Sequence, residues 1–296
     1  MAVLEINNLS KYYGKIKALD GLNLTIEAGN LYGILGPNGS GKTTTLGLIL
    51  DILKPDSGYY TWFDGAYGDK SRLKIGSILE TPNFYPYMNA AENLEIVRQI
   101  KNVDDVDIDE LLELVNLAHR RKSKFRTYSL GMKQRLAIAA TLIGEPEVLI
   151  FDEPTNGLDP QGIAEVREIL MRIAGMGKSV IMASHILDEV EKICSHVAII
   201  KKGKLLASGP VGGILNNDIT VEIASANMDE LKSVLSTKSF VKEVNEMSQW
   251  VECLVDQETD ITEFSHEIYK SGIIPTRIVA RKRRLEEEFL EITKEA

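Results

Sequence analysis

The sequence predicts an α/β fold with a parallel central sheet, followed by a small α+β domain. Apolar runs at 31–35 and 148–153 are the first sign, because strands buried on both faces of a parallel sheet are almost continuously apolar. A glycine-rich turn at 36–44 joins the first run to a helical pattern. Beyond residue 218, strand-like and helical segments alternate in a second pattern. We therefore expect one α/β domain and one accessory domain.

The composition is that of an ordinary globular protein. Hydrophobic residues make up 44% of the 296 residues and charged residues 26%. No run approaches the roughly 18 apolar residues of a membrane span, and no signal-peptide profile is visible, so we expect a cytoplasmic protein. The net charge of −9 argues against nucleic-acid binding. Cys194 and Cys253 lie far apart in unlike contexts, which predicts two buried thiols rather than a disulfide or metal site.

Charge also indicates a domain boundary. Most of the net negative charge lies after residue 217, so the tail differs in composition from the rest of the chain. We therefore predict domains at 1–217 and 218–296, with a helical sub-domain at about 82–146.

The glycine-rich turn carries the strongest motif. It consists of Gly36, Pro37, Asn38, Gly39, Ser40, Gly41, Lys42, Thr43 and Thr44. This is the pattern G-x-x-x-x-G-K-[ST], in which converging backbone N–H groups and a helix N-terminus hold the β- and γ-phosphates of a nucleotide. Lys42 is expected to neutralise phosphate charge and the Thr43 hydroxyl to bind Mg²⁺. An ordinary Gly/Pro turn is the alternative, but the flanking strand and helix are the context that the motif requires.

Two strands of an antiparallel layer are expected before this loop, at 3–13 and at 22–27, where apolar and polar residues alternate. Tyr13 ends the first strand. An aromatic side chain there can stack on a nucleotide base, although a strand tyrosine is more often a packing residue.

Aromatic residues gather at 84–88 in a loop without regular periodicity. Two interpretations stay open, since the side chains can pack into the core or form an exposed contact for a partner protein. Helical patterns follow, and Asn89 with Glu92 has the spacing of a capping box.

A serine and a glycine begin the last helix of this region. Ser129 precedes a helical apolar run and is a good N-cap, with Gly131 in the first turn. These residue types at a helix N-terminus can bind phosphate, although capping alone also explains them.

Two later strands end in side chains suited to phosphoryl chemistry. Asp152 and Glu153 end an apolar strand, at the edge where α/β folds bind ligands. We expect Asp152 to hold Mg²⁺ directly or through water, and Glu153 to polarise an attacking water. A strand at 179–183 leads to His185, which of the four histidines is our candidate for touching the γ-phosphate.

The C-terminal pattern predicts the order βαββαβ, which is that of a ferredoxin-like fold. The strands are expected at 219–224, 240–246, 250–255 and 274–280, and the helices at 228–235, 261–269 and 284–293. No catalytic constellation is visible in this tail.

Taken in order, the motifs resemble the nucleotide-binding subunit of an ABC transporter over about residues 2–215. The resemblance implies the P-loop NTPase fold, with a RecA-like core, an antiparallel β layer and a helical sub-domain, and it implies ATP hydrolysis with ATP and Mg²⁺. The motifs that carry it are Tyr13, the glycine-rich loop, Glu80-Thr81-Pro82, Ser129-Leu130-Gly131-Met132-Lys133-Gln134, Asp152-Glu153-Pro154-Thr155, Asn156-Gly157-Leu158-Asp159 and Ser184-His185.

The resemblance also implies roles for single residues. Tyr13 resembles the aromatic residue that stacks on adenine. Asp152 resembles the metal-binding carboxylate and Glu153 the general base. Asp159 resembles the D-loop residue and His185 the switch histidine.

The signature motif departs from the family pattern, which is usually Leu-Ser-Gly-Gly-Gln. Tyr128, Leu130 and Met132 stand where Leu, Gly and Gln are usual. Ser129 and Gly131 are retained, and the resemblance implies that they contact the γ-phosphate held by the opposite subunit.

Glu80 stands where the family has a glutamine that reaches Mg²⁺ and the attacking water. A glutamate brings negative charge and only accepts hydrogen bonds. Either it binds the cation more strongly, or it sits back from the γ-phosphate until the metal arrives. Glu80, Phe84-Tyr85-Pro86 and the signature are together similar to the bacitracin and lantibiotic branch of peptide-antibiotic exporters and immunity transporters, although drug and sodium exporters share much of the pattern.

The implied assembly is a homodimer, or a pair of ATP-binding subunits, that closes head to tail around ATP. Contacts made only in the ATP state would drive closure. Lys42, Mg²⁺ and His185 would neutralise charge while Glu153 orients water.

An integral membrane permease is the implied partner, contacted near 84–88 at the cytoplasmic face of the membrane, and no nucleic acid is expected. The alternative is a soluble ABC ATPase with a regulatory, non-transport role. Relatives in translation carry two cassettes and relatives in DNA repair carry a long coiled-coil insertion, and the sequence has neither.

Overall fold

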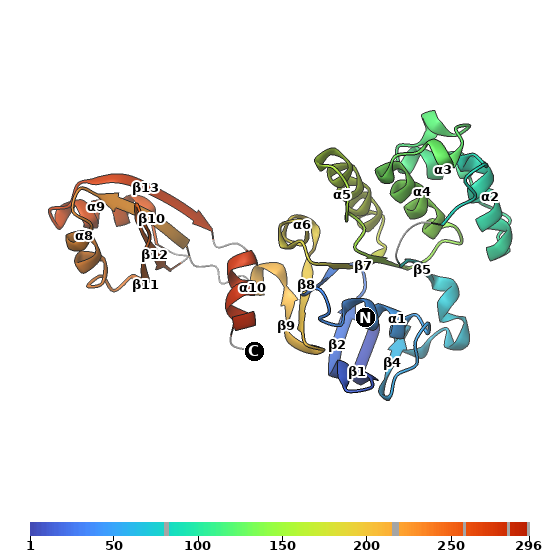
Figure 1. Ribbon diagram of the computed structural model, residues 1–296, viewed down its shortest axis with the longest axis horizontal. Coiled ribbons are helices and arrows are strands. Elements are labelled where there is room, and N and C mark those ends of the chain that lie inside the picture. The colour runs from blue at the N-terminus through green and yellow to red at the C-terminus, as the bar shows by residue number, and fades with distance from the viewer. Residues whose placement is uncertain (80–82, 215–218, 257–258, 283–284, 295–296) are drawn as a thin grey trace. The chain divides into compact units, whose positions relative to one another are not determined.

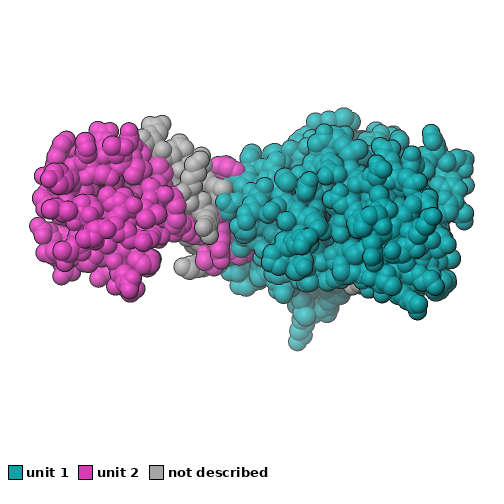
Figure 2. Space-filling view, turned by 90° about the horizontal axis from the view of Figure 1, so that it is seen from above, with its two compact units in different colours: residues 1–211, 292–296 teal, residues 212–291 magenta. Residues whose placement is uncertain are grey.

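The computed structural model describes the chain except for residues 80–82, 215–218, 257–258, 283–284 and 295–296. The chain forms two compact units, which Figure 2 shows in different colours. Unit 1 comprises residues Met1–Val211 and Ile292–Ala296, and unit 2 comprises Gly212–Glu291. Among the described residues, no helix has the length and apolar character needed to cross a membrane.

A six-stranded sheet forms the centre of unit 1 (Figure 1). In spatial order its strands are β5 (Ile75–Ile78), β6 (Val148–Asp152), β7 (Ser179–Ser184), β3 (Leu31–Leu35), β8 (His196–Lys201) and β9 (Lys204–Pro210). Only the pairing of β8 with β9 is antiparallel. β3 and β7 are buried along their whole length, as a parallel sheet covered on both faces requires. The predicted α/β class is confirmed.

An antiparallel layer packs against this sheet. Its strands are β2 (Ile16–Glu27), β1 (Ala2–Tyr13) and β4 (Ser57–Trp62), in that order. Strand β2 begins at Ile16, earlier than expected, because it pairs with Tyr13 directly across a tight turn. Register shifts between β1 and β2 interrupt the alternation of apolar and polar residues in the first half of β2, so the sequence did not predict that half as a strand.

Helices cover the sheet, with α4, α5 and α6 above it and α1 below it in Figure 1. The helices of unit 1 are α1 (Lys42–Ile49), α2 (Ala90–Lys101), α3 (Ile108–Leu114), α4 (Leu130–Leu142), α5 (Pro160–Gly175), α6 (Leu187–Ile193) and α7 (Val211–Ile214), the last of which continues into unit 2. Short 3₁₀ turns occupy Phe63–Gly65, Gly68–Lys74, Ala118–Arg120 and Phe125–Thr127. Asn89 and Glu92 form the predicted capping box at the start of α2.

Unit 2 has the element order βαββαβ. Its elements are β10 (Ile219–Ser225), α8 (Met228–Leu235), β11 (Val241–Glu246), β12 (Val251–Val255), α9 (Ile261–Lys270) and β13 (Pro275–Lys282). Helix α10 (Leu285–Lys294) follows, and its last residues belong to unit 1. The antiparallel sheet has the order β11-β12-β10-β13. Val221, Phe264 and Cys253 belong to one buried cluster between this sheet and its helices. Cys253 and Cys194 are free and buried, as predicted.

The division into units differs from the predicted boundary at 217. Unit 2 starts at Gly212, and residues 292–296 group with unit 1. The reason for the second difference is visible at Lys201, whose ammonium donates to Thr293 O. Composition alone does not report such a contact between distant parts of the sequence.

Candidate nucleotide-binding site

The glycine-rich loop connects β3 to α1, and its backbone excludes side chains at several positions. A Cβ on Gly36 would lie 2.2 Å from Ile200 O, and one on Gly41 would lie 2.5 Å from Ala18 O. Gly41 has a φ of 113° and Gly39 a φ of 78°, both in the left-handed region. The loop therefore needs glycine for its turn and for close approach to neighbouring backbone.

Lys42 begins α1, and its buried ammonium folds back over the loop. Nζ donates to Gly36 O at 2.8 Å and to Pro37 O at 3.4 Å. It also lies 3.6 Å from Glu153 Oε1. A lysine ammonium at a glycine-rich turn that opens a helix is an arrangement that attracts phosphate.

Thr43 and Asp152 meet beside this ammonium. Thr43 Oγ1 donates to Asp152 Oδ2 at 2.7 Å, which joins the first turn of α1 to the end of β6. Hydroxyl and carboxylate oxygens suit Mg²⁺ when phosphates supply further ligands. No group of three or more His, Cys, Asp and Glu side chains in the described part of the chain could hold a metal. The Thr43 and Asp152 oxygens fit a cation whose remaining ligands come from a bound nucleotide.

Glu153 and His185 form a second pair at the same edge. Nδ1 of His185 lies 2.8 Å from Glu153 Oε2. Glu153 has a φ of 49°, a conformation that costs about 1–3 kcal/mol for a side chain other than glycine. Its backbone N–H donates to Ala183 O at the end of β7, which stabilises this conformation. The carboxylate thus contacts both a histidine and the Lys42 ammonium.

The strand order explains this convergence. β7 lies between β6 and β3, and all three run parallel, so the side chains that follow them gather at one edge. The structure therefore brings together five of the predicted site residues, which are Lys42, Thr43, Asp152, Glu153 and His185.

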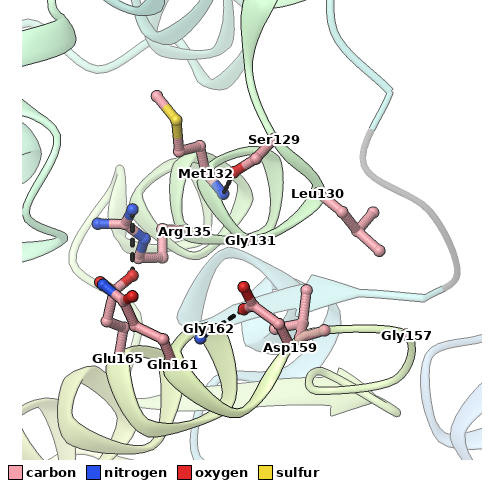
Figure 3. A pocket seen from close by; sticks show the side chains of 11 residues that line it. Ser129, Leu130, Gly131, Met132, Arg135, Gly157, Asp159, Gln161, Gly162 and Glu165 are labelled. Carbon is pink, nitrogen blue, oxygen red and sulfur yellow. Dashed lines mark hydrogen bonds and ion pairs between the residues drawn. The ribbon is translucent and has the colours of Figure 1, made fainter.

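Three other predicted residues lie around a separate pocket, shown in Figure 3. Ser129 caps α4 by accepting from Met132 N–H at 3.3 Å, and Asp159 caps α5 by accepting from Gly162 N–H at 2.8 Å. Together with Gly131 they line a polar pocket of about 450 Å³. No residue of the loop 36–44 lines this pocket. A single chain thus presents the loop and the signature residues as two separate surfaces.

Tyr128 shows what replaces the usual leucine of the signature. Its ring is buried against Phe125, and its hydroxyl donates to Arg120 O at 2.8 Å. Burial raises the pKa of the Tyr128 hydroxyl, although nearby arginines oppose the shift. The tyrosine therefore packs inside the helical sub-domain and leaves Ser129 at the surface of the pocket.

In the aromatic loop, residues 84–88, one aromatic ring packs within the fold and two are exposed. Phe84 packs edge-on against Phe125, with ring centroids 5.2 Å apart. Tyr85 and Tyr87 are 48% and 62% exposed. Glu80, predicted to lie at the metal, falls outside the described residues.

Tyr13 is exposed at the end of β1, with the Lys11 ammonium 5.8 Å from its ring centre. Tyr13 is 47% exposed, and stacking on a base requires an aromatic side chain that a ligand can reach.

Sequence reasoning missed several buried polar residues. Asn93 accepts from Tyr85 N–H at 2.8 Å and donates to Tyr85 O at 3.2 Å, so it holds the aromatic loop. The sequence could have indicated Asn93, because it is a polar residue on the otherwise apolar face of α2. Thr155 donates to the buried Glu189, a pairing between distant segments for which the sequence contains no signal.

The α/β fold, together with the glycine-rich loop and the side chains gathered at the ends of β3, β6 and β7, defines a P-loop nucleotide-binding protein. The family model described as ABC transporter matches residues 19–156. The chain is 44% identical to the bacitracin transport ATP-binding protein BcrA of Bacillus licheniformis, over 70% of each chain. It is 32% identical to BcrA of Enterococcus faecalis over 97% of this chain and 95% of that one. It is 38% identical to the lantibiotic transport ATP-binding protein SrtF of Streptococcus pyogenes, over 74% and 99%.

Solved structures agree with these relatives. The ATP-binding cassette MJ0796, described as a dimeric post-hydrolysis state bound to ADP and Pi, matches with a TM-score of 0.61 at 27% identity, over 70% of this chain and 98% of that one. The chain belongs to the ABC transporter family, as an ATP-binding subunit that hydrolyses ATP to power transport.

Proposed function

We propose that this chain energises a separate membrane permease that exports a peptide antibiotic or gives immunity to one, and that it works at the cytoplasmic face of the membrane. The observation that carries the proposal is the similarity to proteins named for bacitracin and lantibiotic transport. One of these similarities extends through unit 2 as well as unit 1.

Hydrolysis would take place at the edge formed by the ends of β3, β6 and β7. Thr43 and Asp152 would hold Mg²⁺, with Glu80 as a third candidate, and the cation would offset phosphate charge. Lys42 would bind the β- and γ-phosphates. Glu153 would orient the attacking water and accept its proton, and its contact with His185 supports that orientation.

A second copy would complete the site. Ser129 and Gly131 line a pocket to which the loop 36–44 does not contribute, so one chain does not surround a nucleotide with both. In a head-to-tail dimer these two residues and Asp159 would meet the nucleotide held by the partner's loop. Tyr13 would stack on the adenine. ATP would then hold two copies together until hydrolysis removes the γ-phosphate.

The aromatic loop would contact the permease. Tyr85 and Tyr87 are exposed, and the Asn93 side chain fixes the loop through two hydrogen bonds to the Tyr85 backbone. An aromatic pair on a rigid base suits an interface, because little conformational freedom is lost on binding.

The test is antibiotic protection in a sensitive bacterium that expresses the chain with its copurifying membrane protein. The proposal predicts that expression of the chain raises the inhibitory concentration of bacitracin or a lantibiotic. It predicts that the Glu153→Gln variant gives no such protection. Protection against unrelated drugs alone would contradict the substrate class. For the interface, Tyr87→Ala should reduce copurification of the membrane protein, whereas Tyr59→Ala, at an equally exposed tyrosine of β4, should not.

A further inference from the structure

Arg135 is a buried cation in the middle of α4, with only 7% of its surface exposed. Its Nη1 donates to Val115 O at 3.1 Å and to Asn116 O at 3.0 Å, at the end of α3. Its Nη2 lies 3.2 Å from Glu165 Oε2 on α5. One guanidinium therefore joins three helices. In Figure 3 a dashed line joins it to Glu165, and both residues line the pocket that Ser129 also lines.

The ion pair links two helices that begin at the pocket. Ser129 is the N-cap of α4 and Asp159 the N-cap of α5. Arg135 and Glu165 each lie less than two helical turns beyond these caps, about 9 Å along the axis. A bond at this level fixes how far apart the two helix N-termini lie.

The helix N-termini also approach each other closely. A Cβ added to Gly131 would lie 3.8 Å from Gly162 Cα, and one added to Gly157 would lie 3.3 Å from Leu130 Cδ2. Small changes in the separation of α4 and α5 therefore alter the lining of the pocket. The Arg135–Glu165 ion pair, which lies further along the two helices, holds α4 and α5 at this separation.

Burial of this arginine is costly, since a guanidinium loses its water and needs partners of good geometry. Its Nε has no hydrogen-bond partner among the described residues. A leucine at this position would pack without that cost. The charge is therefore explained better by the bonds that it makes to α3 and α5 than by packing.

We propose that Arg135 is a positioning residue for the half of the ATP site that serves the partner copy. It sets α4 against α5, so that Ser129, Gly131 and Asp159 form one surface for the nucleotide held by the second copy. It does not act on the nucleotide held by its own loop. This inference rests on the proposed head-to-tail dimer.

The experiment separates ATP binding within one chain from ATP-driven pairing of two chains. Both are measured in full-length protein that carries Glu153→Gln to stop turnover. Binding of mant-ATP to the dilute monomer reports the loop, and sedimentation with Mg²⁺ and ATP reports the dimer. The test variants are Arg135→Lys, which keeps the charge but loses the planar fork of donors, and Glu165→Gln, which removes the negative charge that pairs with Arg135 on α5.

The matched control is Arg172→Gln. Arg172 lies on α5 and donates to Leu114 O and Glu168, so it bonds α3 as Arg135 does, and these bonds do not involve α4. The proposal predicts that both test variants weaken ATP-driven dimerisation roughly tenfold. Mant-ATP affinity should stay unchanged in both, and the control should dimerise normally.

Two results would overturn the proposal. One is a fall in mant-ATP affinity that parallels the fall in dimerisation, which would place the effect within the chain's own site. The other is dimerisation of both test variants at the level of the parent. If Arg135→Lys is poorly folded by calorimetry, Glu165→Gln decides alone. Failure of the parent itself to dimerise with ATP would instead contradict the proposed dimer.

Discussion

The buried pair Thr155–Glu189 gives a prediction whose size can be worked out from the structure. Thr155 is 3% exposed and Glu189 5% exposed, and the Thr155 hydroxyl donates to Glu189 Oε2. Thr155→Val keeps the shape of the side chain but removes this donor. A buried acceptor left without its partner costs about 1–3 kcal/mol, and a charged one costs more.

We expect Thr155→Val to lower the stability of unit 1 by roughly 2 kcal/mol, which corresponds to a fall in Tm of about 4–8 °C for a domain of this size. Calorimetry of the full chain measures the shift. Thr155→Ser retains the hydroxyl and should melt close to wild type. In the double variant Thr155→Val/Glu189→Leu, part of the loss should be recovered because no buried carboxylate is left. A Tm of Thr155→Val within 1 °C of wild type would refute the reasoning.

Three further predictions follow from single positions. Gly41→Ala should abolish ATP binding, because the new Cβ would collide with Ala18 O. Gly175→Ala, where a Cβ meets nothing within 4 Å, should bind ATP normally. Equal ATP binding by the two variants would contradict this prediction. Asn89→Ala should cost about 1 kcal/mol in urea unfolding through loss of the capping box, and no change would mean that the cap is not formed in solution. Burial raises the pKa of the Cys253 thiol to about 12 and that of Cys194 far above its usual range, so iodoacetamide at pH 8 should label both only after unfolding; rapid labelling of the folded chain would disagree.

The sequence predicted best those site residues that directly follow a strand. Asp152, Glu153 and His185 were placed at strand ends, and parallel pairing then brings such ends together whatever the exact strand order. The glycine-rich loop could be predicted for a related reason, because its backbone conformation depends on glycines at fixed spacing.

Contacts between separate helices could not be predicted in this way. Arg135 and Glu165 look like ordinary charged positions of α4 and α5, and only the packing of the two helices brings them within 3.2 Å. The early part of β2 was missed for a local reason, since a shifted register removes the alternation by which a strand is recognised.

The most direct test of the account is ATP turnover by the Glu153→Gln variant. If Glu153 orients the attacking water, turnover should fall at least ~100-fold while mant-ATP still binds, because amide nitrogen and oxygen do not accept a proton as a carboxylate does. Glu147→Gln is the matched control, because it makes the same change at an exposed glutamate just before β6, at the other end of the strand from Glu153. This control variant should hydrolyse ATP normally. Turnover of Glu153→Gln at the level of this control would contradict the assignment of Glu153 to the reaction.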